Sequence, residues 1–185
     1  MSPNLEEQLI KKYPSILQKH SLPKEASALY WGFECNDGWY DIIDTLLTAL
    51  SELYSTGVFF DGKSVALEPP KVIASQVKEK FGTLRFYYSL EFPQQYHDFL
   101  TQYLNTDQER IIESWANGYR DYVDGIIHYA EVLSSRTCEV SGMKGIYHRS
   151  ESGWVKVLNP EIAQTHSHYK DRNFKPFNQN EINNQ

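Results

Sequence analysis

The strongest pattern of hydrophobic and polar positions falls between residues 36 and 57. Its apolar residues recur mainly in steps of three and four, at Trp39, Ile42, Ile43, Leu46, Leu50 and Leu53. Such spacing places them on one face of an α-helix. Asn36 or Asp37 is suited to cap the start of this helix, and Gly57 is suited to close its end. We therefore predict a buried helix over about 38–55.

A second and longer helical pattern follows residue 106. Its apolar stripe consists of Ile111, Ile112, Trp115, Tyr119, Tyr122, Ile126, Tyr129 and Leu133. Thr106 and Glu109 have the T-x-x-E spacing of a capping box, in which each side chain satisfies a backbone N–H of the first turn. We predict a helix over about 107–135, which would be about 43 Å long and would cross the whole domain.

Residues 71–91 have the two-residue periodicity of β-strands. Successive side chains would point to opposite faces on both sides of Gly82, which is typical of two β-strands joined by a tight turn. We predict an antiparallel hairpin over about 71–91, ended by Pro93. The preceding segment, DGKSVALEPP, is predicted to be a loop.

Weaker patterns predict two shorter helices. Residues 4–20 have helical spacing that is interrupted by Pro14, so we expect a helix that kinks or restarts at this proline. Residues 94–104 are predicted to form another short helix.

After residue 136 the chain has Gly and Ser between short apolar pieces. This composition predicts a small knuckle-like β element over 137–169, packed on the end of the long helix. Residues 170–185 are polar and rich in Asn, which is typical of a flexible tail with Phe174 and Phe177 as docking points. The predicted fold class is α+β: a helical domain over 1–136 with a long central helix and a β-hairpin, then the small C-terminal element.

Composition and charge narrow the classes of function. A chain of 185 residues indicates one domain, with or without a small appendage. Its formal charge of −6 argues against nucleic acid as the main partner, because such binding draws on clustered Lys and Arg. The same charge suits a basic protein partner. The 13 tyrosines suit half-buried positions and interfaces.

The compartment is predicted from what the chain lacks. Its two cysteines, Cys35 and Cys138, are far apart and give no disulfide framework, so a reducing compartment is expected. The N-terminal residues contain no apolar run suited to a signal peptide, and no stretch approaches the roughly 18 apolar residues of a membrane span. We predict a cytoplasmic protein without membrane association, unless a dedicated secretion machine exports it.

The long helix has a polar face opposite its apolar stripe. Six residues fall within about 80° of one another on a helical wheel, namely Glu113, Asn117, Asp121, Asp124, His128 and Glu131. Such a row could hold a hard metal ion, or pair a general base with the group that orients it. More commonly it is the solvated face of an amphipathic helix, which is also a contact surface for a basic partner. The candidate partner-binding residues are Glu113, Asp121, Asp124, His128 and Glu131.

Residues 137–145, TCEVSGMKG, look like half of a zinc knuckle. Ser141 stands where the second thiolate of a C-x-x-C pair would be needed. The remaining candidate ligands are His148, His166 and His168. Structural zinc sites normally have four protein ligands, usually in two close pairs, so we predict no bound metal and no other cofactor. Cys138 is then a vestigial ligand position filled by a small buried apolar residue.

Two other stretches are candidates for chemistry and favour structural roles. In ECNDGWYD, Cys35 would need a lowered pKa to act as a nucleophile, yet acidic neighbours raise it, so we favour turn residues with Trp39 as a core anchor. In QVKEKFGTLRFY, basic and aromatic residues alternate in a way that can bind single strands. Its cations are Lys78, Lys80 and Arg85, too few in an acidic protein to bind nucleic acid strongly.

Three stretches together, ECNDGWYDIIDTL, QVKEKFGTLRFYY and TCEVSGMKG…SGWVKVLNPE, resemble a family of uncharacterised proteins encoded by bacteria and their phages. Members of that family tend to read G-D-G-W-Y, then Q-V-K-E-K-F-G-x-L-R-F-Y, and then T-C-E-x-C-G with G-W-x-x-T-L-C. The resemblance covers roughly residues 34–160. It implies a bacterial or phage origin and a cytosolic location, and it brings no activity with it.

The chain departs from the family pattern at Ser141 and Asn159, where the family has thiols. If the family ends in a zinc-ribbon-like knuckle, the resemblance implies that this chain keeps the fold of that element without its metal. Apolar packing would then have to hold the element together, by Val140, Ile146, Trp154 and Leu158.

Three functional hypotheses follow from these features. The favoured one is a non-catalytic binding protein of the immunity or inhibitor type, which neutralises or modulates a basic toxin or a host enzyme. The second is a metal-dependent hydrolase that uses Asp121, Asp124 and His128. The third is a structural accessory protein of phage or host.

Overall fold

The computed structural model describes residues 1–18, 28–53, 57–60, 63–104 and 107–177. Its helices are α1 (Pro3–Lys12), α2 (Tyr40–Ser51), α3 (Gln94–Gln102), α4 (Asp107–Ser134), α5 (Pro160–Thr165) and α6 (Ser167–Lys170), with short 3₁₀ turns η1 (Ala28–Trp31) and η2 (Asp37–Trp39). Its strands are β1 (Gly57–Phe60), β2 (Lys63–Ala66), β3 (Lys71–Lys80), β4 (Thr83–Glu91), β5 (Ile146–Arg149), β6 (Val155–Leu158) and β7 (Lys175–Pro176). The predicted α+β class is confirmed.

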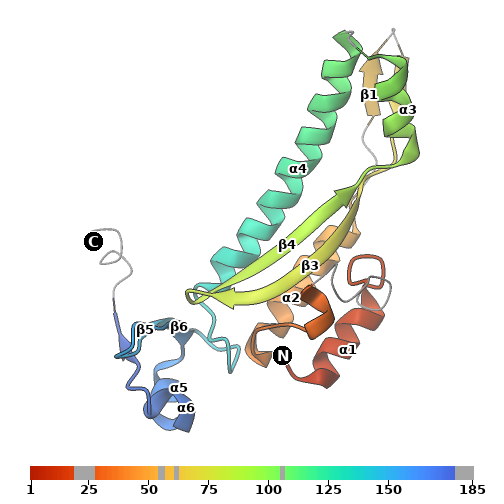
Figure 1. Ribbon diagram of the computed structural model, residues 1–185. Helices are drawn as coiled ribbons and strands as arrows, with labels where there is room; N and C mark the ends of the chain where they lie inside the picture. Colours follow the sequence, from red (N-terminus) through yellow and green to blue (C-terminus); the bar gives the residue numbers. More distant parts are fainter. Residues whose placement is uncertain (19–27, 54–56, 61–62, 105–106, 178–185) are drawn as a thin grey trace.

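The molecule is elongated along α4, which runs from one end almost to the C-terminal element (Figure 1). The half of α4 nearer the C-terminal element packs against α2 and β4, whereas the other half packs against α3 and β1. The long helix predicted over 107–135 is confirmed, as is the short helix predicted over 94–104. Thr106, half of the predicted capping box, lies outside the described residues.

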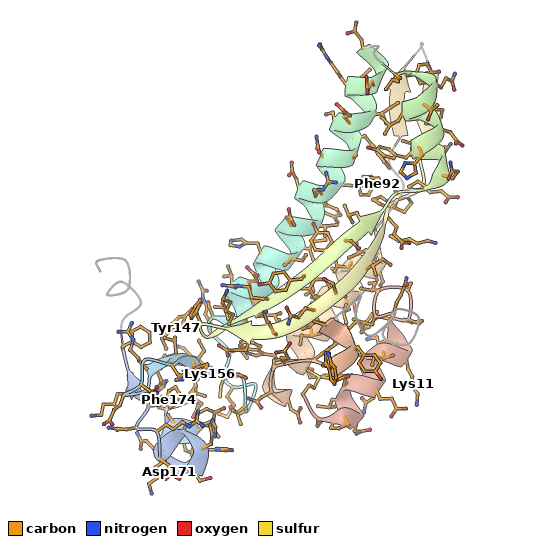
Figure 2. The ribbon with its side chains drawn as sticks, viewed as in Figure 1. Lys11, Phe92, Tyr147, Lys156, Asp171 and Phe174 are labelled. Atoms are coloured by element: carbon orange, nitrogen blue, oxygen red, sulfur yellow. The ribbon has the colours of Figure 1, made fainter. Side chains whose placement is uncertain are left out.

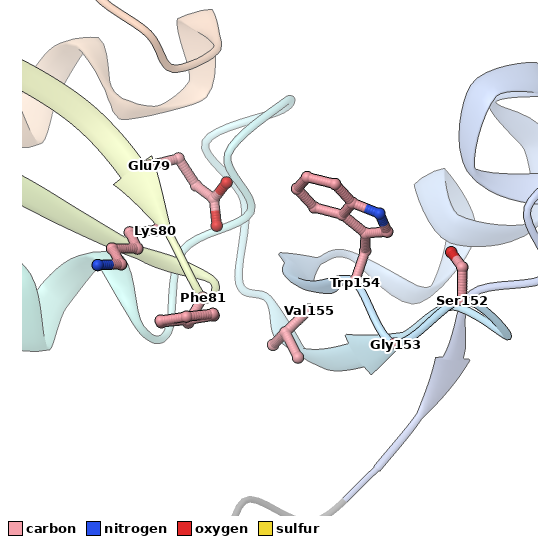
Figure 3. A pocket seen from close by; sticks show the side chains of 7 residues that line it. All are labelled: Glu79, Lys80, Phe81, Ser152, Gly153, Trp154 and Val155. Atoms are coloured by element: carbon pink, nitrogen blue, oxygen red, sulfur yellow. The ribbon is translucent and has the colours of Figure 1, made fainter.

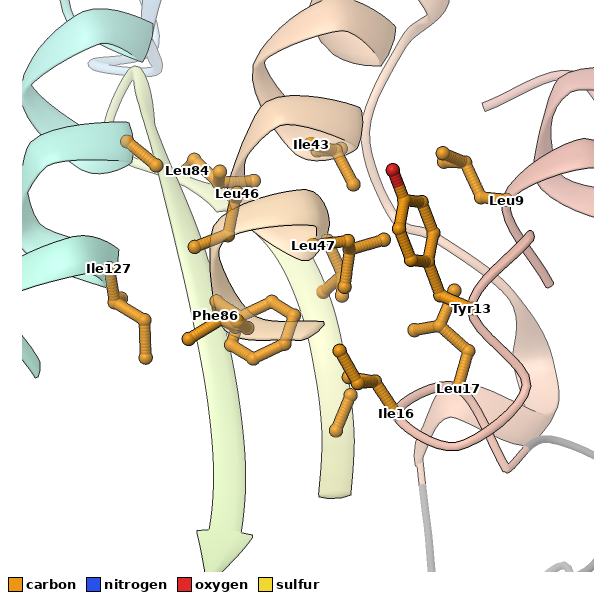
Figure 4. Close-up of a cluster of buried hydrophobic side chains, with 14 of the residues drawn as sticks. Leu9, Tyr13, Ile16, Leu17, Ile43, Leu46, Leu47, Leu84, Phe86 and Ile127 are labelled. Carbon is orange, nitrogen blue, oxygen red and sulfur yellow. The ribbon is translucent and has the colours of Figure 1, made fainter. Parts of the chain in front are cut away.

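The main core lies around α2, which lies between the N-terminal segment on one side and β4 and α4 on the other (Figure 4). Apolar side chains from these elements form one buried cluster, which includes Leu9, Leu17, Ile43, Leu47, Leu84, Phe86 and Ile127. α1 ends before Pro14, and the chain continues as a turn that buries Ile16 and Leu17 rather than as a second helix. A second, smaller cluster holds the far end of α4 through Leu67, Trp115, Ala116 and Tyr119.

The predicted hairpin over 71–91 is confirmed as β3 and β4, paired antiparallel with an irregularity between Ala74 and Gln76. The outer edge of β3 is partly covered, because Ala74 N–H donates to the carbonyl of Ile16 and Glu34 forms a parallel bridge with Lys78. The predicted loop DGKSVALEPP is wrong in part, since Lys63–Ala66 form β2 and pair antiparallel with β1.

α2 begins and ends differently from the prediction. Neither Asn36 nor Asp37 caps a helix through its side chain. Asn36 Nδ2 donates to Glu139 instead, and Asp37 Oδ1 accepts from the backbone N–H of Ser2. Gly57 is the first residue of β1 and not the end of the helix. The predicted role of Trp39 is confirmed, because its side chain is fully buried.

The C-terminal element is a three-stranded antiparallel sheet in the order β6–β5–β7, covered by α5 and α6. Its own core consists of Cys138, Leu158, Ala163, Tyr169 and Phe174. The prediction that apolar packing holds this element is confirmed for Leu158 and for the partly buried Val140, and wrong for Ile146 and Trp154, which are exposed. A zinc-ribbon-like character for this element stays a prediction.

The prediction of a flexible tail from residue 170 is wrong for 170–177. This segment ends α6, buries Phe174 and adds β7 to the sheet. The ring of Phe177 lies edge-on to that of Tyr147, at 5.9 Å between centroids. Docking by both phenylalanines thus organises the part of the tail that the structure describes. Within the described residues, no helix combines the length and the apolar character needed to cross a membrane.

Candidate interaction surfaces

The acidic row of α4, defined as Glu113, Asp121, Asp124, His128 and Glu131, is solvent-facing, with only Glu131 partly buried. Two of its members are engaged with β4. Asp124 accepts a 2.7 Å hydrogen bond from the hydroxyl of Tyr88, and Glu131 lies 3.4 Å from the guanidinium of Arg85. The row is therefore an exposed helix face that is partly tied to the neighbouring strand.

The acidic row does not form a metal site. Among the residues that the structure describes, no three His, Cys, Asp or Glu side chains are grouped so that they could hold a metal ion. Asp124 is oriented by Tyr88 on β4, and the same hydrogen bond contributes, after burial, to raising the pKa of that tyrosine well above its ordinary range. The residues predicted for a hydrolase thus lie along one helix without converging.

A groove of about 480 Å³ lies between α2 and α4. We call it the α2–α4 groove; it is lined by Ile42, Thr45, Leu46, Ala49, Asp121, Tyr122, Gly125, Ile126, Tyr129, Ala130 and Leu133. Most of these side chains are apolar, and Asp121 joins the groove to the acidic row. A groove of this volume and character falls in the range of ligand-binding sites.

The groove is formed by apolar side chains of α4 that the sequence predicts to be buried. The buried face of the helix is rotated about the helix axis relative to the predicted face. The most buried side chains of the helix are Ile112, Trp115, Ala116, Tyr119, Val123, Ile127 and Ala130. Tyr122 and Tyr129, predicted in the core, are instead exposed, Tyr129 to 65%. Ile126 and Leu133 are only partly buried and line the groove with them. An apolar strip is thereby left open to solvent.

A second cleft, of about 410 Å³, separates the tip of the β3–β4 hairpin from the β5–β6 turn (Figure 3). Phe81 and Trp154 lie on its opposite sides, with 68% and 64% of their surfaces exposed. Phe81 also has a left-handed backbone conformation, with φ of +54°. For a bulky residue this conformation costs on the order of 1–2 kcal/mol. The hairpin tip therefore displays an aromatic ring at some expense of stability.

Replacing Phe81 with asparagine is expected to stabilise the protein by about 1 kcal/mol, because asparagine tolerates the left-handed conformation that this two-residue turn requires. Little burial is lost, since the ring is mostly exposed. Urea unfolding measures the change. Phe81→Ala is the matched control: it removes the same ring without the conformational gain, so it should not stabilise. A loss of stability in Phe81→Asn would contradict this account of the turn.

A buried ionic network joins the hairpin to the C-terminal element. Lys156 Nζ on β6 lies 2.6 Å from Glu79 Oε2 on β3 and 2.9 Å from Glu139 Oε2. The side chain of Glu139 is only 2% exposed. Burial by itself lowers the pKa of Lys156, but the attraction of Glu139 and the hydrogen bonds to both carboxylates outweigh it, so this pKa is raised. Figure 2 shows Lys156 and Tyr147 on the side of the element that faces the hairpin, with Asp171 on the far side.

The turn that precedes α2 also contacts the C-terminal element. We call this contact region, together with the ionic network, the junction. The indole N–H of Trp39 donates to the carbonyl of Thr137 at 2.9 Å, and Gly38 N–H donates to the carbonyl of Glu139 at 2.9 Å. Gly38 packs directly on Gly142: a Cβ on Gly38 would lie 2.4 Å from the backbone nitrogen of Gly142. The three stretches behind the family resemblance therefore meet at one junction, which the sequence alone did not indicate.

The two cysteines and the buried histidine have no chemical role that the geometry supports. Burial raises the pKa of the Cys35 thiol to about 12, so it is protonated and poorly nucleophilic near neutral pH. Cys138 is fully buried in the C-terminal core, which confirms the prediction of a small apolar role. His148 is buried, its Nδ1 lies 2.9 Å from the carbonyl of Ile146, and burial lowers its pKa.

No family model matches this chain, and neither the curated proteins nor the solved structures contain a match to it. The resemblance to bacterial and phage-encoded proteins therefore stays a prediction.

Proposed function

We propose that this chain is a non-catalytic binding protein, of bacterial or phage origin, that acts in the cytoplasm by neutralising or modulating a basic protein partner. The observation that supports this proposal most directly is the open apolar α2–α4 groove, whose lining includes Asp121 of the acidic row of α4. Apolar contact area with charged residues at its edge is the usual composition of a protein–protein interface.

The side chains at the groove suit binding by contact. Tyr129 and Tyr122 are large and exposed, and tyrosine is enriched among the residues that dominate binding energy at interfaces. An acidic surface attracts a basic partner over several ångströms and speeds association. Toxins and host enzymes that act on nucleic acids are basic for the same electrostatic reason, which makes them suitable targets for an immunity or inhibitor protein.

The two other hypotheses gain no support of this kind. A hydrolase would require its acid, base and metal ligands to converge in a cavity, whereas Asp124 and His128 do not line the α2–α4 groove. Self-assembly of an accessory protein through the acidic row of α4 would bring like charges together, which disfavours that contact.

Affinity capture tests the proposed function. The immobilised chain is exposed to lysate of its own cells, and bound proteins are quantified by mass spectrometry. We expect one basic partner at near-stoichiometric amounts. Replacing both Asp121 and Asp124 with lysine should lower its recovery at least about tenfold, equivalent to 1.4 kcal/mol of binding free energy.

The matched control carries the same charge change at Glu7 and Asp98, two exposed acidic residues outside α2 and α4. Recovery of the partner by this control should stay within about twofold of wild type, because long-range attraction contributes less than contacts at the interface. The proposal fails if no stoichiometric partner is recovered, or if reversal on α4 has no more effect than the control.

A further inference from the structure

We propose that the α2–α4 groove binds one amphipathic α-helix of the partner, with aliphatic residues on one face and Lys or Arg on its flanks. This inference rests on the proposed function and specifies the chemistry of the partner segment. It follows from the length of the groove, from the helical hydrogen bonding of the backbone in both of its walls, and from the charges at its edge.

The groove has the dimensions of a few helical turns. Its α4 side extends from Asp121 to Leu133, and its α2 side from Ile42 to Ala49. At 1.5 Å per residue the α4 side is about 18 Å long, roughly three turns of a parallel or antiparallel helix. An occupying helix would present anchors at i, i+3, i+4 and i+7, the usual spacing for helix-in-groove recognition.

The walls of the groove exclude an extended strand as occupant. Both walls are α-helices, whose backbone N–H and C=O groups are bonded within the helix. A strand placed between them would find no ladder of donors and acceptors, and its own buried backbone groups would be unsatisfied. A helix satisfies its own backbone groups and needs only side-chain contact, so it is the secondary structure that this groove favours.

Small residues give the groove room for another helix. Ala49 lies on α2, and Gly125 and Ala130 lie on α4. A Cβ added to Gly125 would meet no atom within 4 Å, so open space lies directly above the α4 backbone at this position. Small residues at a contact allow helix axes to approach closely. Tyr122 and Tyr129 can then contact the incoming helix on its sides.

The charges near the groove select a basic helix. α2 has two acidic residues and α4 has six, against two basic residues, Arg110 and Arg120, in the pair. Asp44 and Glu131 are paired with Lys12 and Arg85, and Asp124 accepts a hydrogen bond from Tyr88 on β4. The negative charge at the groove therefore comes from Asp121, which lines it, and from the exposed Asp41, which precedes the lining residue Ile42. A second copy of this chain would add the same negative charge, whereas Lys and Arg on the flanks of a partner helix would complement it.

A peptide-binding assay with two glycine variants tests the inference. The probe is a fluorescein-labelled peptide of about 18 residues, roughly five turns, with Leu on one helical face and Lys elsewhere. Gly125→Leu should fill the groove and weaken binding at least about tenfold in a fluorescence anisotropy titration. Gly118→Leu is the matched control, because Gly118 is on the same helix, has open space above it and does not line the groove.

Binding to Gly118→Leu should stay within about twofold of wild type. Both variants should keep or raise the melting temperature, because leucine favours a helix interior over glycine. Two further peptides define the ligand: a scrambled sequence that lacks the apolar face, and one with Glu in place of Lys. Each should bind wild type at least about tenfold more weakly than the probe.

Four results would overturn the inference. These are no saturable binding of the probe to wild type, equal binding to Gly125→Leu, equal binding of the scrambled peptide, and a wild-type dimer in analytical ultracentrifugation that Gly125→Leu abolishes. The last result would assign the groove to a second copy of this chain. If affinity capture recovers a partner that Gly125→Leu still binds normally, the groove inference fails and the proposed function stands. If the probe binds in the groove but no partner is captured, the proposed function fails alone.

Discussion

Replacing Lys156 with methionine is expected to destabilise the protein by about 3–5 kcal/mol, because it leaves the carboxylates of Glu79 and Glu139 buried together without a cation. Both carboxylates lie within 3 Å of the ammonium group in the wild type. Chemical denaturation monitored by tryptophan fluorescence measures the loss. Since the network joins the hairpin to the C-terminal element, the transition of the variant should also lose cooperativity.

Two companion variants separate charge from packing in this prediction. Lys12→Met removes a pair of similar length, 2.8 Å to Asp44, whose lysine is 53% exposed, and it should cost much less stability than Lys156→Met because solvent screens an exposed pair. Lys156→Met combined with Glu79→Gln and Glu139→Gln removes the uncompensated charges and should recover at least half of the lost stability. If Lys156→Met alone lowered the stability only slightly, the ionic network would not stabilise the contact between the hairpin and the C-terminal element as proposed.

The same network gives a dependence on alkaline pH. The folded-state pKa of Lys156 lies above its ordinary value of 10.5. Its contribution to stability is therefore fully present below pH 10.5 and is lost as the pH rises through the folded-state pKa. The difference in stability between wild type and Lys156→Met should accordingly narrow in strongly alkaline buffer.

Replacing Gly38 with alanine is the second prediction with a large effect. The added Cβ would lie 2.4 Å from the nitrogen of Gly142 and 2.5 Å from the carbonyl oxygen of Cys138. Both are backbone atoms of the C-terminal element, so this element must shift away from α2, and the loss should be about 3 kcal/mol or more. Thermal unfolding measured by circular dichroism gives the size of the effect.

Gly118→Ala is the control for Gly38→Ala. A Cβ at Gly118 meets nothing within 4 Å, and alanine in a helix interior should stabilise by roughly 0.5–1 kcal/mol relative to glycine. Opposite signs for the same substitution at the two glycines are the expected result. A neutral Gly38→Ala variant would mean that the junction is looser than its contacts indicate.

The elements that the sequence predicted well are those whose signal is local. α2, the β3–β4 hairpin, α3 and α4 each follow from periodicity within their own residues, because a helix or hairpin with one buried face imposes its repeat on the side chains. The exposed position of the acidic row of α4 follows for the same reason.

The rotation of α4 could not be predicted from its own sequence. Tyrosines and aliphatic residues occur on both sides of the helix, and both sides have helical spacing. Which side is buried depends on where α2 and β4 pack, and α2 leaves Tyr122 and Tyr129 uncovered. Tertiary packing thus decides which side of the helix is buried. The apolar side chains on the side that stays uncovered line the groove.

The junction was missed because its residues are far apart in the chain. Glu79, Glu139 and Lys156 are unremarkable charged residues in sequence, and only folding brings them together. The sequence around Gly38 does not indicate its contact with Gly142, because a glycine in a turn is already explained by the backbone conformations that turns require. The polar composition of residues 170–177 predicts a tail, but the burial of one aromatic ring, that of Phe174, is enough to fix this segment on the C-terminal element.

Amide hydrogen exchange of the chain with its captured partner tests the central claim most directly, because it locates the contact surface without any substitution. We expect slower exchange in segments 42–49 and 121–133 when the partner is added, and unchanged exchange around Phe81 and Trp154. Protection confined to the cleft between Phe81 and Trp154, or no protection along α2 and α4, would contradict the account.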